Sequence, residues 1–190
     1  MFMLYGLLAG LLLGRLAGGE VARLERVSIR WAPLALMGLL AQLVLYLQPV
    51  AERVGALGMP IYVASTATVL VVVIRNVRLP GLALVAVGAA SNLAAIAANG
   101  GYMPASAGAL AALGKSINAG YSNSAIVPAP ALAPLTDVIA MPRWLPFANV
   151  FSLGDVLICL GVALAVVALM RGGASRNLPR TYSQPGTSGS

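Results

Sequence analysis

Two aspartates, Asp137 and Asp155, are the residues of this chain whose type and spacing best suit chemistry. They are its only aspartates and stand 18 positions apart (155 − 137), and fifteen uncharged residues, 156–170, follow the second. Two carboxyl groups held close together cannot both ionise cheaply, so they share a proton and can act as general acid and general base. The pattern makes Asp137 and Asp155 candidate catalytic residues.

Polar side chains that could orient these acids lie within or beside apolar runs. Asn92 lies near the end of one run, and Asn99 follows at helical spacing on the same face. On an inward face, an amide can donate to a carboxylate instead of facing lipid. Ser152, three residues before Asp155, is the third candidate.

A purely structural interpretation of both aspartates is also open. Asp155 precedes a long apolar run, so it could be the N-cap of the last helix. Asp137 lies between Pro134 and Pro142, where it could pair with Arg143 or close a turn.

Composition indicates which environment surrounds the chain. Its 190 residues are 59% hydrophobic and 9% charged, against about 25% charged in soluble domains. The surface must therefore be apolar and face lipid. The net charge of +7 does not indicate nucleic acid, because the arginines cluster in short loops between apolar runs. With no histidine and the single cysteine Cys159, a disulfide within the chain and a Cys/His zinc site are excluded, and we expect no metal or cofactor.

Apolar runs of about 20 residues are long enough to span a bilayer. The sequence predicts an all-α membrane bundle over 1–171 with about five spans, at 2–18, 31–49, 57–74, 79–98 and 148–170. A span from 148 places Asp155 several residues inside the last helix. Residues 99–147 form the predicted outer loop, with a short helix at about 105–114, and 172–190 form a disordered tail rich in Gly, Ser and Pro.

Basic residues predict the orientation of the bundle. With five spans, nine of them fall on the side that holds the loops at 19–30 and 75–78 and the tail, and three fall on the other side. The positive-inside rule then places the N-terminus outside and the C-terminus in the cytoplasm. Both aspartates belong to the outer face.

The segment Phe151-Ser152-Leu153-Gly154-Asp155 resembles the last transmembrane motif of lipoprotein signal peptidase, a bacterial aspartic peptidase that cuts within the membrane. Residues 135–139, around Asp137, are similar to the stretch that supplies that family's other catalytic aspartate, and residues 88–92, which end in Asn92, are similar to its Gly-Asn motif. The family's asparagine before the last aspartate is Ser152 here, and its Asp-Arg pair corresponds to Ala95 and Ile96. The resemblance implies a bacterial inner-membrane protein.

A likeness over more of the chain is to an uncharacterised family of bacterial five-span membrane proteins, a domain of unknown function. Its Ala-Asn-Gly-Gly-x-Met-Pro signature is similar to residues 98–104, and its late Ile-Ser-x-Gly-Asp segment is similar to residues 151–155. This resemblance implies no activity.

Two functions follow as hypotheses. One is an aspartic intramembrane peptidase-like protein that uses Asp137 and Asp155, with Asn92, Asn99 and Ser152 as the polar site and a lipoprotein or membrane peptide as substrate. The other is a non-catalytic accessory or structural subunit of a larger membrane complex, or a module that binds a small ligand or lipid. The first requires the two carboxyl groups to converge.

Overall fold

The structure is a computed structural model, and it describes residues 2–115 and 124–172. Most of these residues are helical. The predicted tail at 172–190 lies outside the described residues except for Gly172. Five long helices, α1 (Phe2–Leu16), α2 (Ala32–Leu45), α4 (Gly58–Arg75), α5 (Leu82–Ala98) and α7 (Leu153–Met170), form the body of the molecule.

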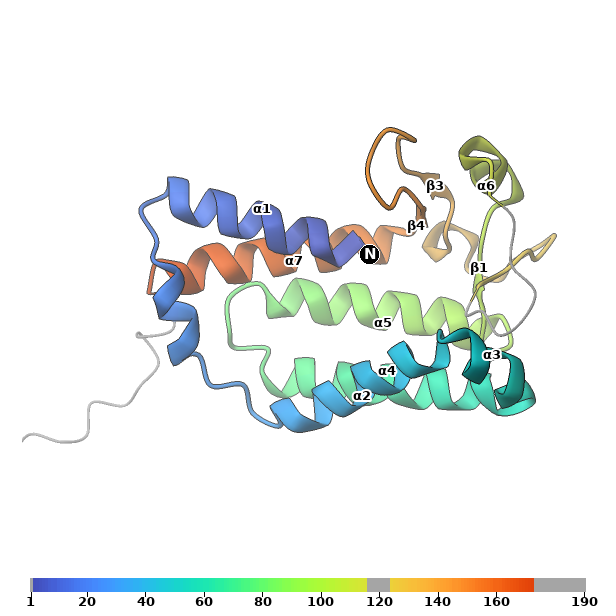
Figure 1. The fold of residues 1–190 in the computed structure, drawn as a ribbon, viewed down its shortest axis with the longest axis horizontal. Helices are drawn as coiled ribbons and strands as arrows, with labels where there is room; N and C mark the ends of the chain where they lie inside the picture. Colours follow the sequence, from blue (N-terminus) through green and yellow to red (C-terminus); the bar gives the residue numbers. More distant parts are fainter. Residues whose placement is uncertain (1, 116–123, 173–190) are drawn as a thin grey trace, which may run out of the picture.

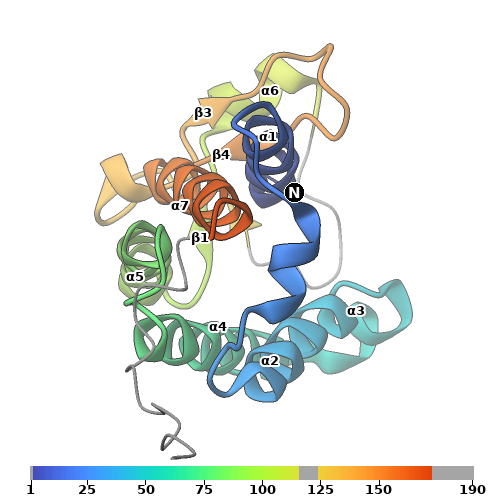
Figure 2. The same ribbon diagram turned by 90° about the vertical axis from the view of Figure 1, so that its left-hand side faces the viewer.

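The five long helices run along the same axis and form an open arc (Figures 1 and 2). In order around the arc, α1 packs on α7, α7 on α5, α5 on α4, and α4 on α2. Short elements connect the first helices: the 3-10 helices η1 (Val21–Arg26) and η2 (Gly55–Leu57), and α3 (Gln48–Val54).

The remaining short elements gather at one end of the bundle, which we name the outer end (Figure 1). They are β1 (Met103–Pro104), α6 (Ala107–Leu113), β2 (Ser124–Ala125), η3 (Ala133–Leu135), β3 (Ile139–Ala140) and β4 (Val150–Phe151). Strand β1 pairs in parallel with β2, and β3 pairs antiparallel with β4. A small core of Ala105, Ala109, Leu110 and Val150 joins α6 to β4.

Helix α7 packs closely against two neighbours, α1 and α5, because glycines at these contacts let the helices approach. A Cβ atom at Gly6 of α1 would overlap the carbonyl oxygen of Cys159, and one at Gly88 of α5 would overlap the carbonyl oxygen of Gly154. Small residues at such contacts favour tight packing of apolar helices. Cys159 itself is a free, half-buried thiol, as expected of a packing residue.

Each predicted span contains one long helix, but most helices are shorter than the predicted span. Within the described residues, two helical runs are long and apolar enough to cross a membrane. They are Leu153–Met170, which is α7, and Pro49–Arg75, which joins most of α3 to η2 and α4. The shorter apolar helices there are Met3–Leu16, Ala32–Leu45 and Leu82–Ala98. Non-helical residues occupy some ends of the predicted spans. Gly81, with φ +80°, precedes α5, and strand β4 lies at the start of the predicted last span. The predicted helix at 105–114 corresponds to α6.

The opposite end of the bundle, which we name the inner end, carries most of the described basic residues. There the Asn76 side chain, at the end of α4, bonds to the backbone of Arg30, just before α2. The Asn76 amide donates to the carbonyl oxygen of Arg30 at 2.9 Å and accepts from the Arg30 backbone N–H at 2.8 Å. The Arg75 guanidinium lies 5.5 Å from the ring centre of Trp31, a cation–π contact. Glu20 and Arg23 form an ion pair there at 2.7 Å.

Candidate functional site

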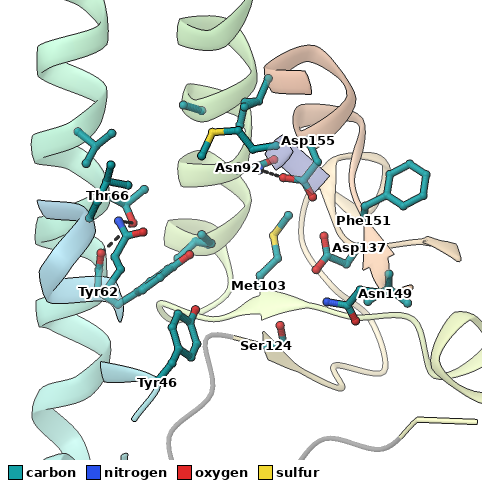
Figure 3. Close-up of a pocket in the computed structure, with 18 of the residues that line it drawn as sticks. Tyr46, Tyr62, Thr66, Asn92, Met103, Ser124, Asp137, Asn149, Phe151 and Asp155 are labelled. Atoms are coloured by element: carbon teal, nitrogen blue, oxygen red, sulfur yellow. Dashed lines mark hydrogen bonds between the residues drawn. The ribbon is translucent and has the colours of Figure 1, made fainter. Parts of the chain in front are cut away.

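A cavity of about 600 Å³ lies at the outer end of the bundle. All five long helices contribute to it, from Met3 of α1 to Ile158 of α7, together with the segments around β1, β3 and β4. Figure 3 shows Asn92, Asp155 and Asp137 on one side of this cavity. We name this side, with these three residues, the acid wall.

Asp155 is held by hydrogen bonds to both of its carboxylate oxygens. Oδ1 accepts from the Asn92 amide at 2.8 Å, and Oδ2 accepts from the backbone N–H of Ser152 at 3.1 Å. The Ser152 hydroxyl donates to the Asn92 side-chain oxygen at 2.8 Å and accepts from the Asp155 backbone N–H at 3.1 Å. In these contacts both oxygens of the Asp155 side chain act as hydrogen-bond acceptors.

This network corrects two expectations about Asp155. The N-cap of α7 is Ser152, and Asp155 is the third helical residue of a capping box. Asp155 therefore lies in the first turn and not several residues inside the helix, because β4 and the Ser152 cap delay the start of α7 to Leu153. A carboxylate in the first turn also interacts favourably with the helix dipole.

Glycine packing brings Asn92 to Asp155. A Cβ atom at Gly154 would overlap the side-chain oxygen of Asn92, so only glycine leaves room for the amide between α5 and α7. Ser152 is completely buried at this joint. Two helices distant in sequence thus share one polar network.

Backbone pairing places Asp137 beside this network. Its N–H donates to the Pro104 carbonyl oxygen at 3.0 Å, and its carbonyl oxygen accepts from the Ser106 N–H at 2.9 Å. Two residues later, Ile139 of β3 pairs with Phe151 of β4, immediately before the Ser152 cap. The short β3–β4 ladder therefore carries Asp137 to the start of α7.

The environment of Asp137 favours its protonated form. Burial, and secondarily the neighbouring Asp155 carboxylate, raise the pKa of Asp137 from 3.8 to about 7. The ion pair with Arg143 that the sequence allowed is not formed, since the Arg143 guanidinium donates to the carbonyl oxygens of Ala112 and Ala111 at the end of α6. No ion pair to Asp137 occurs in the described residues.

Asn99 does not join the acid wall. It is the C-cap of α5, and its amide donates to the carbonyl oxygens of Ala95 at 2.8 Å and Ala131 at 2.9 Å. Its side-chain oxygen accepts from the Ala131 N–H at 2.9 Å. The backbone of Asn99 is no longer helical, so the helical spacing between Asn92 and Asn99 did not predict the contacts of Asn99. It fixes the outer loop to the end of α5.

The rest of the Ala-Asn-Gly-Gly-x-Met-Pro segment turns the chain back over the cavity. Gly100 and Gly101 have φ values of +72° and +91°, which side chains rarely adopt, and a Cβ at Gly101 would overlap Met59. Met103 then lines the cavity, and Pro104 supplies the carbonyl oxygen that Asp137 binds.

The opposite side of the cavity, which we name the amide–phenol wall, was missed in the sequence. It consists of Tyr62 and Thr66 from α4 and Tyr46 at the C-cap of α2, which Figure 3 labels, together with Gln42 of α2, which binds Thr66. Gln42 Nε2 donates to Thr66 Oγ1 at 3.2 Å, and the two tyrosine rings meet edge to face at 6.4 Å. A glutamine inside an apolar run and polar residues four apart, Tyr62 and Thr66, were the available signals.

The acid wall can supply an acid and a base but offers few metal ligands. No group of three or more His, Cys, Asp or Glu side chains gathers within residues 2–115 and 124–172. The described residues that line the cavity include no lysine or arginine. Two carboxyl groups in different environments, with no cation between them, suit general acid–base chemistry on a neutral group.

The fold and the cavity define a mostly helical protein that contains helices able to cross a membrane. The chain belongs to DUF5317, a family of unknown function, whose model matches residues 26–167. The predicted membership of a domain of unknown function is confirmed. No curated protein and no solved structure matches the chain.

Proposed function

We propose that the chain is a five-span protein of the bacterial inner membrane, with its N-terminus outside and its C-terminus in the cytoplasm. Five apolar helices that run along one axis support this arrangement, as do the basic residues at the inner end. Large apolar side chains such as Leu8, Met37 and Leu164 are exposed on the helices, where lipid would cover them.

Within that arrangement, the acid wall is the active site of an aspartic peptidase-like hydrolase. The observation that carries this proposal is the pairing of unlike carboxyl groups in one cavity. Asp155 receives N–H donors on both oxygens, whereas burial raises the pKa of Asp137 to about 7. One group is thus suited to act as base and the other as acid.

The reaction follows from these two protonation states. The Asp155 carboxylate takes a proton from water while the water oxygen bonds to the carbonyl carbon, and the Asp137 carboxyl group protonates the carbonyl oxygen. In the second step, the carbon–nitrogen bond breaks, Asp155 protonates the departing nitrogen, and Asp137 recovers a proton from a hydroxyl of the tetrahedral intermediate. Asn92 and Ser152 hold the base in position.

The substrate class is a peptide segment at the outer face of the membrane, such as a lipoprotein precursor or another membrane peptide. An extended peptide offers neutral polar groups at regular intervals. It could run from the acid wall to Gln42 and Thr66 on the facing side, across the apolar Met103 and Ile96. The absence of basic residues from the described lining disfavours an anionic ligand.

To test this function, the purified protein is placed in lipid vesicles with membrane peptides, and mass spectrometry detects any cleavage products. Asp137→Asn and Asp155→Asn should each lower the rate on the order of a thousandfold, because each removes the acid or the base. Glu52→Gln is the matched control, since Glu52 is an exposed carboxylate on α3 at the same end and does not line the cavity. Cleavage that persists in Asp155→Asn would exclude this function.

A specific observation favours a second candidate, a non-catalytic accessory or structural subunit. The network of Asn92, Ser152 and Asp155 satisfies the cap of α7 and bonds α5 to α7, which is a structural role in itself. In that case the protein should copurify with stoichiometric partners and cleave no peptide. Asp155→Asn should then destabilise the protein or release those partners.

A further inference from the structure

The loop between β3 and β4, residues 141–149, exposes two aromatic side chains at the outer end. Trp144 is 80% exposed and Phe147 is 63% exposed. Exposing a tryptophan or phenylalanine side chain to water is unfavourable in free energy. Tryptophan is enriched where a membrane meets water because its ring is apolar but carries a polar N–H.

Several hydrogen bonds hold the loop in one shape. Arg143 donates to carbonyl oxygens at the end of α6, Lys115 Nζ donates to the Ala148 carbonyl oxygen, and the Tyr5 hydroxyl donates to the Pro146 carbonyl oxygen. Within the loop, the Leu145 N–H donates to Pro142 at 3.1 Å. The basic side chains are therefore engaged with backbone groups, while the aromatic rings remain exposed.

The backbone at Phe147 adopts a conformation that is unfavourable for a residue with a bulky side chain. Its φ of +57° lies in the left-handed region, which costs a bulky residue about 1 kcal/mol or more. The contacts on both sides of it, at Pro146 and Ala148, keep it there. The hydrogen bonds on both sides of Phe147 thus hold an aromatic residue in an exposed position.

The position of the loop identifies that contact. Tyr5 belongs to the second turn of α1, whose Met3, Leu4 and Leu8 are exposed and apolar, so the loop continues the apolar surface of α1 at its outer end. Figure 2 shows the loop beside α1 and α6, on the outside of the helical arc. If the five-span arrangement proposed above holds, the outer end of α1 would lie near the outer lipid headgroups.

We propose that the 141–149 loop is an interfacial anchor that inserts Trp144 and Phe147 into the headgroup region of the outer leaflet. This inference rests on the five-span arrangement proposed above. The anchor would fix the β3–β4 ladder, and with it the strand segment that follows Asp137, at a set depth relative to the bilayer.

Two single-tryptophan proteins test the anchor, because the chain has only two tryptophans. Trp31→Phe leaves Trp144 at the outer end, and Trp144→Phe leaves Trp31 at the inner end. Each is placed in phosphatidylglycerol–phosphatidylethanolamine vesicles that contain lipids brominated either near the headgroup or near the chain end. We expect Trp144 to lose more emission with the shallow label than with the deep one, and to resist quenching by iodide. Unchanged circular dichroism and melting would show that both variants fold.

Trp31 separates the failure of the anchor from the failure of the membrane arrangement. If brominated lipids quench Trp31 but leave Trp144 open to iodide, the anchor is overturned and the bundle remains in the membrane. If Trp144 is shielded from both lipid and iodide, a protein contact covers the loop and the anchor is again overturned. If neither tryptophan responds to any brominated lipid, the five-span arrangement itself fails.

Discussion

Two asparagines, Asn76 and Asn92, join separate segments at opposite ends of the bundle, but they bind different kinds of group. At the inner end, Asn76 bonds to backbone atoms of Arg30 and Val72. At the outer end, Asn92 bonds to the side chains of Asp155 and Ser152. Asn76 thus satisfies backbone hydrogen-bonding groups, whereas Asn92 holds the side chain of Asp155 at the wall of a cavity. The same type of side chain thus binds main-chain groups at one end and an acidic side chain at the other.

Gly154→Ala should disrupt the contacts of Asn92 most severely. Its Cβ would overlap the Asn92 oxygen, so either the amide must move or α5 and α7 must separate. Such overpacking costs about 1–3 kcal/mol of unfolding free energy, and displacing Asn92 should also lower cleavage about a hundredfold. Thermal unfolding and the vesicle cleavage assay measure the two effects.

Gly108→Ala is the matched control for that substitution. Gly108 lies in α6, and a Cβ there would have only the Ser106 hydroxyl within 4 Å, at 3.8 Å. Alanine favours a helix over glycine by about 0.5–1 kcal/mol, so this variant should be as stable as the wild type or more stable. Equal melting temperatures for the two variants would contradict the close packing of α5 on α7.

Replacing each asparagine by alanine compares Asn76 and Asn92 directly. Asn76→Ala leaves the Arg30 backbone groups without their amide partner and should cost about 1–3 kcal/mol of stability, with full cleavage per folded molecule. Asn92→Ala should lower cleavage per folded molecule by roughly tenfold to a hundredfold, because Asp155 loses one of the donors that orient it. Equal cleavage by the two variants would show that Asn92 is also only structural.

The long helices could be predicted because each is an apolar run of sufficient length, whereas their ends depended on local contacts. The helix α7 begins at Leu153 and not at 148, because Val150 and Phe151 pair with the two-residue strand β3 across the 141–149 loop. A strand of two residues has no periodicity that a sequence could reveal. Whether all five helices span the bilayer stays a prediction.

The sequence indicated Asp137 and Asp155, which line one cavity in the structure, but not the residues on its facing side. That the two acids form an active site stays a prediction. Asp137 and Asp155 stood out as the only aspartates of an apolar chain, and Asn92 and Ser152 stood out by their positions within or beside apolar runs. Asn99 met the same criterion yet binds Ala131, since the helix ends one residue before it. The amide–phenol wall escaped notice because glutamine and tyrosine occur in many apolar helices, and only the arc of α2 and α4 turns them toward Asp155.

The stability and the cleavage rate of the wild type should both depend on the protonation of Asp137. Its pKa is about 7 in the folded protein against an ordinary 3.8, so the folded state prefers the protonated group. The stability this group contributes is therefore fully present below pH 4 and is lost as the pH rises toward 7. Cleavage should likewise decline above pH 7, by about tenfold per pH unit, as the general acid loses its proton.

Three variants test whether Asp137 is the titrating group and which physical cause raises its pKa. Asp137→Asn should abolish the loss of melting temperature between pH 4 and 7, while Glu52→Gln should retain it. Asp155→Asn removes the neighbouring negative charge but not the burial, so the titration of Asp137 should move to lower pH and yet stay above 4. Infrared spectroscopy of the carboxyl groups follows this shift without any assay of activity. If Asp137 titrates at the same pH with and without Asp155, the two acids do not interact, and the outer end is as purely structural as the inner one.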